Sequence, residues 1–448
     1  MPGTSSRARH GAALLLLPLA AACAAATPPP APAAAAAGLP TPTGDGAIFF
    51  HPDGTSAGHW DATRSLYYGP DGSLHWDRLA ALTTYRGHLA DQLGATSNAG
   101  AVIHATGTRA HAASFGLDPA GREYVSADGS TRTLMETAVA AGLGTALVQT
   151  GSVIEPGTAA FVAAVPRRQD YEEIARQVLE SGVEILLGGG EEWFLPRGVR
   201  GRFGEGARSD GRNLIERARE LGYTVVYTRA ELRALPPTAR RVLGVFARGH
   251  TFHDRTEEEL RQAGLPHYLP GAPTVAEMID FALARLGTSP RGFLLVAEEE
   301  GSDNFCNVGN AAGCLEALRR ADDAFGVMRA FIERRPNTLL LTTSDSNAGG
   351  IQVVNVAADA TLTPRTAPNG APLDGSGGTG TAPFRSAPDA QGRSFPFAIG
   401  WTSYDDAGSG VLARAHGLRA TELLPATGIQ NIDVYRILYE TLFGRRLP

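Results

Sequence analysis

The chain has 448 residues, 43% of them hydrophobic, so it is long enough to bury a large core in one α/β domain or in a domain with an inserted cap. Its formal net charge of −6 argues against a surface built to bind nucleic acid. All 40 basic residues are arginine. The absence of lysine excludes Schiff-base chemistry, attachment of pyridoxal phosphate and the lysine of the phosphate-binding P-loop.

The first 26 residues have the layout of an export signal. Arg7 and Arg9 precede an apolar stretch at 11–22 that is too short to span a bilayer. Cys23 follows "LAAA", which loosely resembles the lipid-attachment box of bacterial lipoproteins, so lipidation at Cys23 and plain cleavage near Ala26 both stay open. We expect an exported protein, periplasmic or in the cell envelope. The Pro/Ala-rich stretch 27–44 predicts a disordered tether, followed by one folded domain over 45–448.

In that domain, short apolar runs alternate with amphipathic segments. The runs that predict strands are 47–50, 144–150, 183–190, 223–228, 293–298, 338–345 and 395–401, and helices are predicted at 170–181, 211–221, 274–286, 314–334 and 431–443. Such alternation is typical of an α/β fold with a large, mostly parallel central sheet and helices on both faces. The Gly- and Pro-rich stretch 360–394 predicts a long inserted surface loop.

Carboxylates follow three of the predicted strands. Asp53 follows the strand at 47–50, Glu298 and Asp303 follow "FLLVA", and Asp345 follows "TLLLTTS". Because ligand sites gather at the carboxyl ends of parallel strands, these side chains should meet at one edge. Like charges crowd where cations compensate them, so this edge predicts a divalent metal site. The alternative is that each acidic group only caps the next helix.

Four ordered motifs carry a resemblance to a known family. "FFHPDGTSAGHW", "ATSNAGAVIHATG", "EEEGSDNFCNVGNAAG" and "TTSDSNAGG" resemble, in order and spacing, motifs of the alkaline phosphatase family over roughly 45–443. The resemblance implies that 45–448 is a catalytic domain that hydrolyses phosphate monoesters through a phosphoserine. It also implies two catalytic metal ions, usually zinc, and a third, usually magnesium.

The resemblance also assigns roles in catalysis. Ser97 matches the nucleophile, and Thr96, which stands in place of the family's aspartate, is the rival. Arg168 falls where the family has its phosphate-binding arginine, with Arg167 as the neighbouring candidate. A planar guanidinium can bind two phosphate oxygens at once, and a serine at the start of a helix has free backbone amides for the phosphate.

The same carry-over gives a set of metal ligands. Glu298 stands five residues before Asp303, the family's interval, although Glu299 or Glu300 could replace it if the register slips. The complete set implied by the resemblance is Asp53, Glu155, Thr158, Glu298, Asp303, Asn307, Asp345, Ser346 and Asp406. For Glu155 and Thr158 a loop-capping role is the alternative.

Three histidines that the family uses as metal ligands are replaced here. Asn307, Ser346 and Asp406 occupy their places, and oxygen ligands suit hard cations rather than zinc. We therefore expect two or three divalent ions, with Mg²⁺ and Ca²⁺ favoured, Mn²⁺ possible and Zn²⁺ disfavoured. His51 and His59 could reach the pocket, but a structural role is the expected one for each.

Some alternatives stay open from the sequence. The domain is expected to act on a small-molecule phosphate ester, but a phosphodiesterase of the same superfamily or an inactive metal- or phosphate-binding lipoprotein of the envelope also fits. A homodimer is a further expectation from the resemblance. Cys306 and Cys314, eight residues apart, predict a disulfide bond in an oxidising compartment, with two buried thiols as the alternative.

Overall fold

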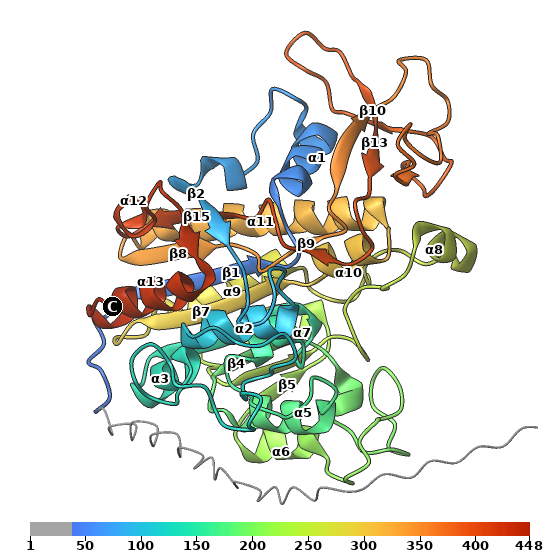
Figure 1. Ribbon diagram of the computed structural model, residues 1–448. Helices are drawn as coiled ribbons and strands as arrows, with labels where there is room; N and C mark the ends of the chain where they lie inside the picture. Colours follow the sequence, from blue (N-terminus) through green and yellow to red (C-terminus); the bar gives the residue numbers. More distant parts are fainter. Residues whose placement is uncertain (1–37) are drawn as a thin grey trace, which may run out of the picture.

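A ten-stranded sheet forms the centre of the computed structural model, which describes residues 38–448 (Figure 1). Its strands, in their order across the sheet, are β16 (Ile429–Gln430), β2 (Ala81–Arg86), β15 (Leu412–Gly417), β8 (Thr338–Thr342), β1 (Gly46–Pro52), β7 (Phe293–Glu299), β3 (Gly144–Ser152), β4 (Ile185–Gly189), β6 (Val242–Val245) and β5 (Thr224–Val226). All are parallel except β15, which runs antiparallel to both β2 and β8. The predicted large, mostly parallel sheet is therefore confirmed.

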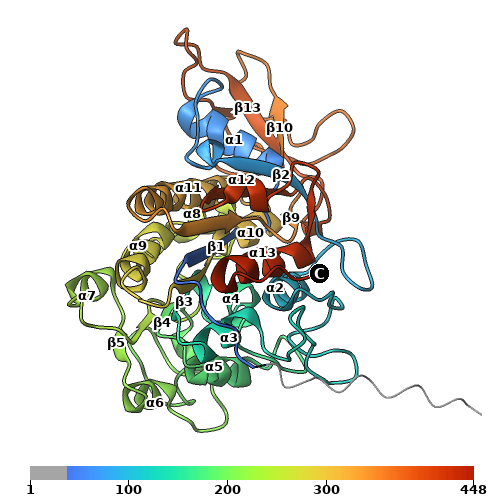
Figure 2. The same ribbon diagram turned by 90° about the vertical axis from the view of Figure 1, so that its left-hand side faces the viewer.

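Helices cover both faces of the sheet, because successive strand residues point to opposite sides. In β1, Ala47 and Phe49 enter one hydrophobic core, and Ile48 and Phe50 enter the other. The first core is covered by α2 (Ser97–Thr106), α3 (Leu134–Ala140), α4 (Pro156–Ala159), α5 (Tyr171–Glu180), α6 (Leu214–Glu220), α12 (Ala420–Leu423) and α13 (Asn431–Phe443). The second is covered by α1 (Ala57–Tyr68), α7 (Arg229–Ala234), α8 (Glu257–Ala263), α9 (Val275–Leu286), α10 (Gly301–Asn307) and α11 (Ala311–Arg334). Figure 2 shows α9 and α11 on one side of β1, and α13, α2 and α3 on the other.

A smaller antiparallel sheet projects beside α1 (Figure 1). It consists of β10 (Gln352–Asn355), β13 (Pro396–Gly400), β11 (Leu373–Asp374) and β12 (Phe384–Arg385). The predicted strand at 395–401 is thus real, but it belongs to this sheet and not to the central one. The stretch 360–394 is mostly loop, as expected, interrupted by β11 and β12.

A two-stranded ribbon completes the architecture. It pairs β9 (Asn347–Ala348) with β14 (Asp406–Ala407), so that Asp406 lies opposite Ala348. The ribbon joins two distant segments of the chain just beyond the end of β8.

The predicted export signal and Cys23 lie outside the described residues. Near the start of the described chain, the Thr43 amide donates to the Leu442 carbonyl at 2.9 Å, and its hydroxyl donates to the Thr441 carbonyl at 3.0 Å. This end of the predicted tether is therefore bound to the last turn of α13. Within residues 38–448, no helix combines the length and apolar character needed to cross a bilayer.

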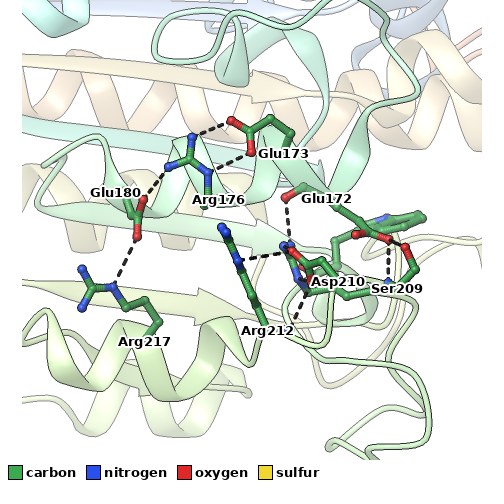
Figure 3. Close-up of polar contacts among 10 residues, drawn as sticks. Glu172, Glu173, Arg176, Glu180, Ser209, Asp210, Arg212 and Arg217 are labelled. Carbon is green, nitrogen blue, oxygen red and sulfur yellow. Dashed lines mark hydrogen bonds and ion pairs between the residues drawn. The ribbon is translucent and has the colours of Figure 1, made fainter.

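Ion pairs connect α5 to α6 at the surface (Figure 3). Arg176 pairs with Glu173 at 2.5 Å and with Glu180 at 2.6 Å, and Arg217 lies 3.3 Å from Glu180. Such solvent-exposed pairs contribute about 1 kcal/mol or less each. The network therefore joins two helices of the outer layer.

Candidate active site

The parallel register brings carboxylates together at one edge of the central sheet. His51 in β1 lies opposite Glu298 in β7, and Gln149 in β3 also lies opposite Glu298. Asp53 follows the end of β1, and Asp345 follows the end of β8, the other neighbour of β1. All four of these ionisable residues are buried.

One group of candidate metal ligands consists of Asp303, Asn307 and Asp406. Asp303 and Asn307 are one turn apart on α10, and the Asn307 amide donates to both Asp303 oxygens at 3.1 Å and to Asp406 Oδ1 at 3.2 Å. Burial raises the pKa of Asp303 well above its usual value, and the nearby Asp406 and Asp53 carboxylates raise it further. Ser346, which follows Asp345 in the chain, lies beside Asp406. The segments predicted to replace histidine ligands therefore meet in space.

A second group consists of His51, Asp53 and Asp345. His51 Nε2 lies 3.4 Å from Asp53 Oδ1 and 3.5 Å from Asp345 Oδ1, while Nδ1 lies 3.5 Å from Glu298 Oε1. Burial alone would lower the pKa of His51, but the carboxylates of Asp53, Asp345 and Glu298 outweigh it and raise the pKa well above its usual value. Burial likewise opposes ionisation of Asp345, yet His51 holds the pKa of this carboxyl below its usual value.

A third group consists of Asp53, Glu298 and Glu300, whose carboxylate oxygens lie within 4.8 Å of one another. Burial raises the pKa of Glu300 well above its usual value, and the charges of Glu298, Glu155 and Asp53 add to this effect. Glu299 points elsewhere and accepts a hydrogen bond from the Tyr268 hydroxyl at 2.7 Å. The run of three glutamates therefore supplies two residues to the site and one to the core.

The α4 segment lies directly over this third group. A Cβ atom at Gly157 would lie 1.7 Å from Glu298 Oε1, so only glycine allows this close approach. The Thr158 hydroxyl accepts a hydrogen bond from Gln149 Nε2 at 2.6 Å. Glu155, the residue before α4, pairs with Arg168 at 3.0 Å. Both predicted ligands are thus near the site, but in the structure Glu155 is the partner of a guanidinium.

The two candidate arginines differ in their surroundings. Arg168 is 37% exposed and pairs with Glu155. The carboxylates of Glu300 and Asp303 lie near enough to raise its pKa. Arg167 is 74% exposed and pairs with Asp170 at 2.5 Å, away from the carboxylate groups. Arg168 is therefore the guanidinium that faces the site.

Ser97 is the first residue of α2 and is 6% exposed. The first hydrogen bond of the helix runs from the Gly100 amide to the Thr96 carbonyl at 2.8 Å, which leaves the amides before Gly100 free for an anion. A Cβ atom at Gly100 would lie 2.5 Å from Asp345 Cβ. Because Gly100 is one turn from Ser97, this contact fixes the start of α2 against the second group.

The side chains beside Ser97 have structural partners. The Thr96 hydroxyl donates to the Ala112 carbonyl at 2.8 Å, and the Asn98 amide donates to the carbonyls of Ala112 and Ser114. The Ser97 hydroxyl makes no hydrogen bond to another described residue. Of the two candidate nucleophiles, Ser97 is therefore the free one.

Buried oxygen atoms without partners test whether cations fit here. Within the described chain, Asp53 Oδ2, both oxygens of Glu298, Glu300 Oε2 and both oxygens of Asp345 have no hydrogen-bond donor. Burying unpaired carboxylates costs several kcal/mol each unless they neutralise or bind metal. The donor set, almost entirely oxygen, fits divalent cations.

The remaining histidines near the site have structural partners. His59 Nδ1 accepts from the Ser56 amide at 3.2 Å, and its Nε2 lies 3.2 Å from Cys306 Sγ. His104 Nε2 lies 2.7 Å from the Tyr85 hydroxyl. Cys306 forms the expected disulfide bond with Cys314, which connects α10 to α11.

A sequence model of the family described as Alkaline phosphatase matches residues 46–368. The chain belongs to the alkaline phosphatase family. Its relatives include alkaline phosphatase of Escherichia coli K12, 26% identical over 290 residues that cover 58% of this chain and 59% of that protein. Streptomycin-6-phosphate phosphatase of Streptomyces griseus is 28% identical over 332 residues, which cover 65% of this chain and 71% of that protein.

Solved alkaline phosphatases share the fold of this family member. The Thermus thermophilus enzyme superposes with a TM-score of 0.70 at 23% identity, covering 92% of this chain and 94% of that one. The enzyme of the Antarctic bacterium TAB5 gives a TM-score of 0.66 at 17% identity, covering 90% and 98%. The structural likeness therefore covers more of the chain than the sequence model, which ends at residue 368.

The structure brings two residues closer to the site than their sequence context predicts. Glu300 was considered only as a substitute for Glu298, whereas both reach the third group. His51 was expected to be structural, but it lies among three carboxylates. The position of His51 at the carboxyl end of β1, two residues before Asp53, is the signal that could have found it.

Proposed function

We propose that this alkaline phosphatase family member hydrolyses phosphate monoesters of small molecules through a phosphoserine at Ser97. The observation that carries the proposal is the free Ser97 hydroxyl at the start of α2, with that helix packed through Gly100 against the buried Asp345. The relatives from E. coli and S. griseus are both named phosphatases. Because the match spans only 59% of the E. coli protein, activity and substrate are carried over as proposals.

The proposed cofactors are two or three divalent cations. In the group of Asp303, Asn307 and Asp406 the atoms that could bind a metal are carboxylate oxygens and the unpartnered Asn307 Oδ1. In the group of Asp53, Glu298 and Glu300 they are carboxylate oxygens alone. Such sets favour Mg²⁺ or Ca²⁺, allow Mn²⁺ and disfavour Zn²⁺. One solved structure of a TAB5 alkaline phosphatase mutant, 18% identical to this chain, has Mg bound.

The proposed reaction has two displacements. Ser97 Oγ attacks phosphorus, the ester P–O bond breaks and the alcohol leaves; water then cleaves the phosphoserine and releases phosphate. Bound divalent ions would supply charge for the apical oxygens and lower the pKa of the attacking hydroxyl or water. The free amides at the start of α2 and the guanidinium of Arg168, oriented by Glu155, would bind the remaining phosphate oxygens.

Export to the periplasm or cell envelope, with or without a lipid at Cys23, is part of the same proposal. The Cys306–Cys314 disulfide supports it, because such bonds persist in oxidising compartments. In this view 1–26 is the export signal, 27–44 a tether and 45–448 the catalytic domain.

The test uses protein stripped of metal with a chelator and assayed with each ion added back. Hydrolysis of p-nitrophenyl phosphate exceeding that of bis-p-nitrophenyl phosphate is expected, and Ser97→Ala should abolish it. Thr96→Val, which removes only the hydroxyl bonded to Ala112, serves as the matched control and should retain most activity. Preference for the diester would favour a phosphodiesterase, and phosphate binding without hydrolysis would favour an inactive binding protein. Full activity of the Ser97→Ala variant would refute a mechanism through a phosphoserine at Ser97.

A further inference from the structure

The imidazole of His51 lies inside the carboxylate cluster without a hydrogen bond. The ring is completely buried, and neither of its nitrogens has a hydrogen-bond partner within residues 38–448. The separations of 3.4 and 3.5 Å between Nε2 and the oxygens of Asp53 and Asp345 are longer than an N–H···O hydrogen bond, which spans about 2.7–3.2 Å. The ring therefore contacts the two carboxylates only electrostatically, and a cation bound between them would satisfy the imidazole and both carboxylates together.

These separations match those of neighbouring ligands on one metal ion. Bonds of about 2.0–2.1 Å in tetrahedral geometry place adjacent donor atoms about 3.4 Å apart. His51 Nε2 has this spacing to both Asp53 Oδ1 and Asp345 Oδ1. We propose that His51 is a metal ligand, and that its Nε2 binds the same divalent cation as Asp53 and Asp345. This proposal rests on the proposed function for the existence of that cation.

The other ring nitrogen has a suitable partner for this role. Nδ1 lies 3.5 Å from Glu298 Oε1, on the side of the ring away from Asp53 and Asp345. A ligating histidine usually donates its second N–H to a carboxylate or carbonyl, which fixes the tautomer and the ring orientation. With Nε2 on the ion, the proton resides on Nδ1 and faces Glu298.

The position of the ring is fixed by the fold. His51 stacks on Phe49 at 5.9 Å between ring centroids and meets the edge of His104 at 5.6 Å. Because residues two apart in a strand share a face, β1 presents Phe49 and His51 on one face, and Asp53 follows directly after the strand ends at Pro52. The imidazole therefore enters the site from the central strand, whereas the position beside Asp345 in the loop after β8 is Ser346.

A nitrogen ligand changes which ion is preferred at this one position. Imidazole suits first-row transition ions, whereas Mg²⁺ and Ca²⁺ prefer oxygen. The two oxygen-only groups should hold hard cations, and the position at Asp53, Asp345 and His51 should select Mn²⁺, Co²⁺ or Zn²⁺ over Mg²⁺. The chain then uses two kinds of ion side by side.

The experiment is a titration of metal-stripped protein with Mn²⁺ in excess Mg²⁺, with pulsed electron paramagnetic resonance used to detect ¹⁴N coupled to the bound ion. The wild type should show the nitrogen signal. His51→Leu should lose it and bind Mn²⁺ at least about tenfold more weakly. His59→Gln is the matched control, because this buried histidine bonds to Ser56, lies beside Cys306 and should leave the signal intact.

The outcomes separate this inference from the proposed function. Bound Mn²⁺ without nitrogen coupling in the wild type, or coupling that persists in His51→Leu, overturns the ligand assignment even if phosphate esters are hydrolysed. Nitrogen-coupled Mn²⁺ in a protein that hydrolyses no ester supports the assignment and refutes the function. If circular dichroism shows that His51→Leu does not fold, His51→Gln takes its place. Glutamine keeps a polar side chain but has no imidazole, so the nitrogen signal of the wild type should be absent from this variant.

Discussion

Replacing Gly100 by alanine tests the contact between α2 and Asp345. The added Cβ would lie 2.5 Å from Asp345 Cβ and 2.7 Å from its Oδ2, whereas ordinary carbon contacts are about 3.5–4.0 Å. The two elements must therefore separate by about 1 Å. In a helix interior, alanine normally stabilises by about 1 kcal/mol relative to glycine, but overpacking of a tight contact costs about 1–3 kcal/mol. We expect the clash to cancel or exceed the helical gain.

The catalytic effect should be larger than the effect on stability. A displacement of about 1 Å between nucleophile and metal ligands can lower the rate about 100-fold. The assay is kcat/KM for p-nitrophenyl phosphate together with the urea midpoint of unfolding. Gly271→Ala is the control, because no atom lies within 4 Å of the added Cβ and its φ is not left-handed. A Gly100→Ala variant that is more stable than the wild type and equally active would contradict the close contact between α2 and Asp345.

Three further predictions follow from the site and its surroundings. Arg168→Ala should reduce kcat/KM by about 100-fold while Arg167→Ala, at an exposed ion pair, changes it little, and equal effects would contradict the assignment. Replacing Cys306 and Cys314 together by alanine should lower the free energy of unfolding by about 2–3 kcal/mol, since the bond closes a short loop; a denaturant midpoint equal to the wild type's would contradict this. Without metal, the melting temperature should fall as the pH rises from about 5 to 8, because groups with raised folded-state pKa values stabilise the fold only while they are protonated. Divalent ions should reverse this loss of stability, by about 2.7 kcal/mol per site when the free ion concentration is 100 times the dissociation constant. A melting temperature of the metal-free protein that does not change with pH would contradict the raised pKa values of the buried carboxyls. The carboxyls concerned are Asp53, Glu298, Glu300, Asp303 and Asp406.

Much of the central sheet could be predicted because buried parallel strands are continuous apolar runs. The strands at 47–50, 144–150, 293–298 and 338–345 are of this kind, and each corresponds to a strand at or beside the centre of the sheet. β2 is not predicted because buried and exposed residues alternate along "ALTTYR", so the segment lacks a continuous apolar run. β15 was missed for the same reason, since "LARAHG" alternates alanine with larger polar residues.

The meeting of Asp53, Asp303 and Asp345 could be predicted because each follows a strand of the central sheet. What the sequence could not supply was the pairing of strands across that sheet. Only the register of β1 with β7 shows that His51 lies beside Glu298, and only the turn into α10 shows that Glu299 leaves the site while Glu300 stays. Histidine inside an apolar strand is usually structural, so composition alone could not show that three carboxylates surround His51.

The pairing of β1 has a consequence for biosynthesis. At the start of β1, Gly46 pairs with Phe293 in β7 and with Thr338 in β8. Asp406, which lies beside Asn307 of α10, is still later in the chain, on β14. A chain emerging from the ribosome therefore contains Asp53 long before Phe293, Thr338 and Asp406 are synthesised, and contacts this distant in sequence form slowly. Cation capture should accordingly be one of the last steps of maturation, so that fragments ending before residue 406 remain metal-poor and open to proteolysis.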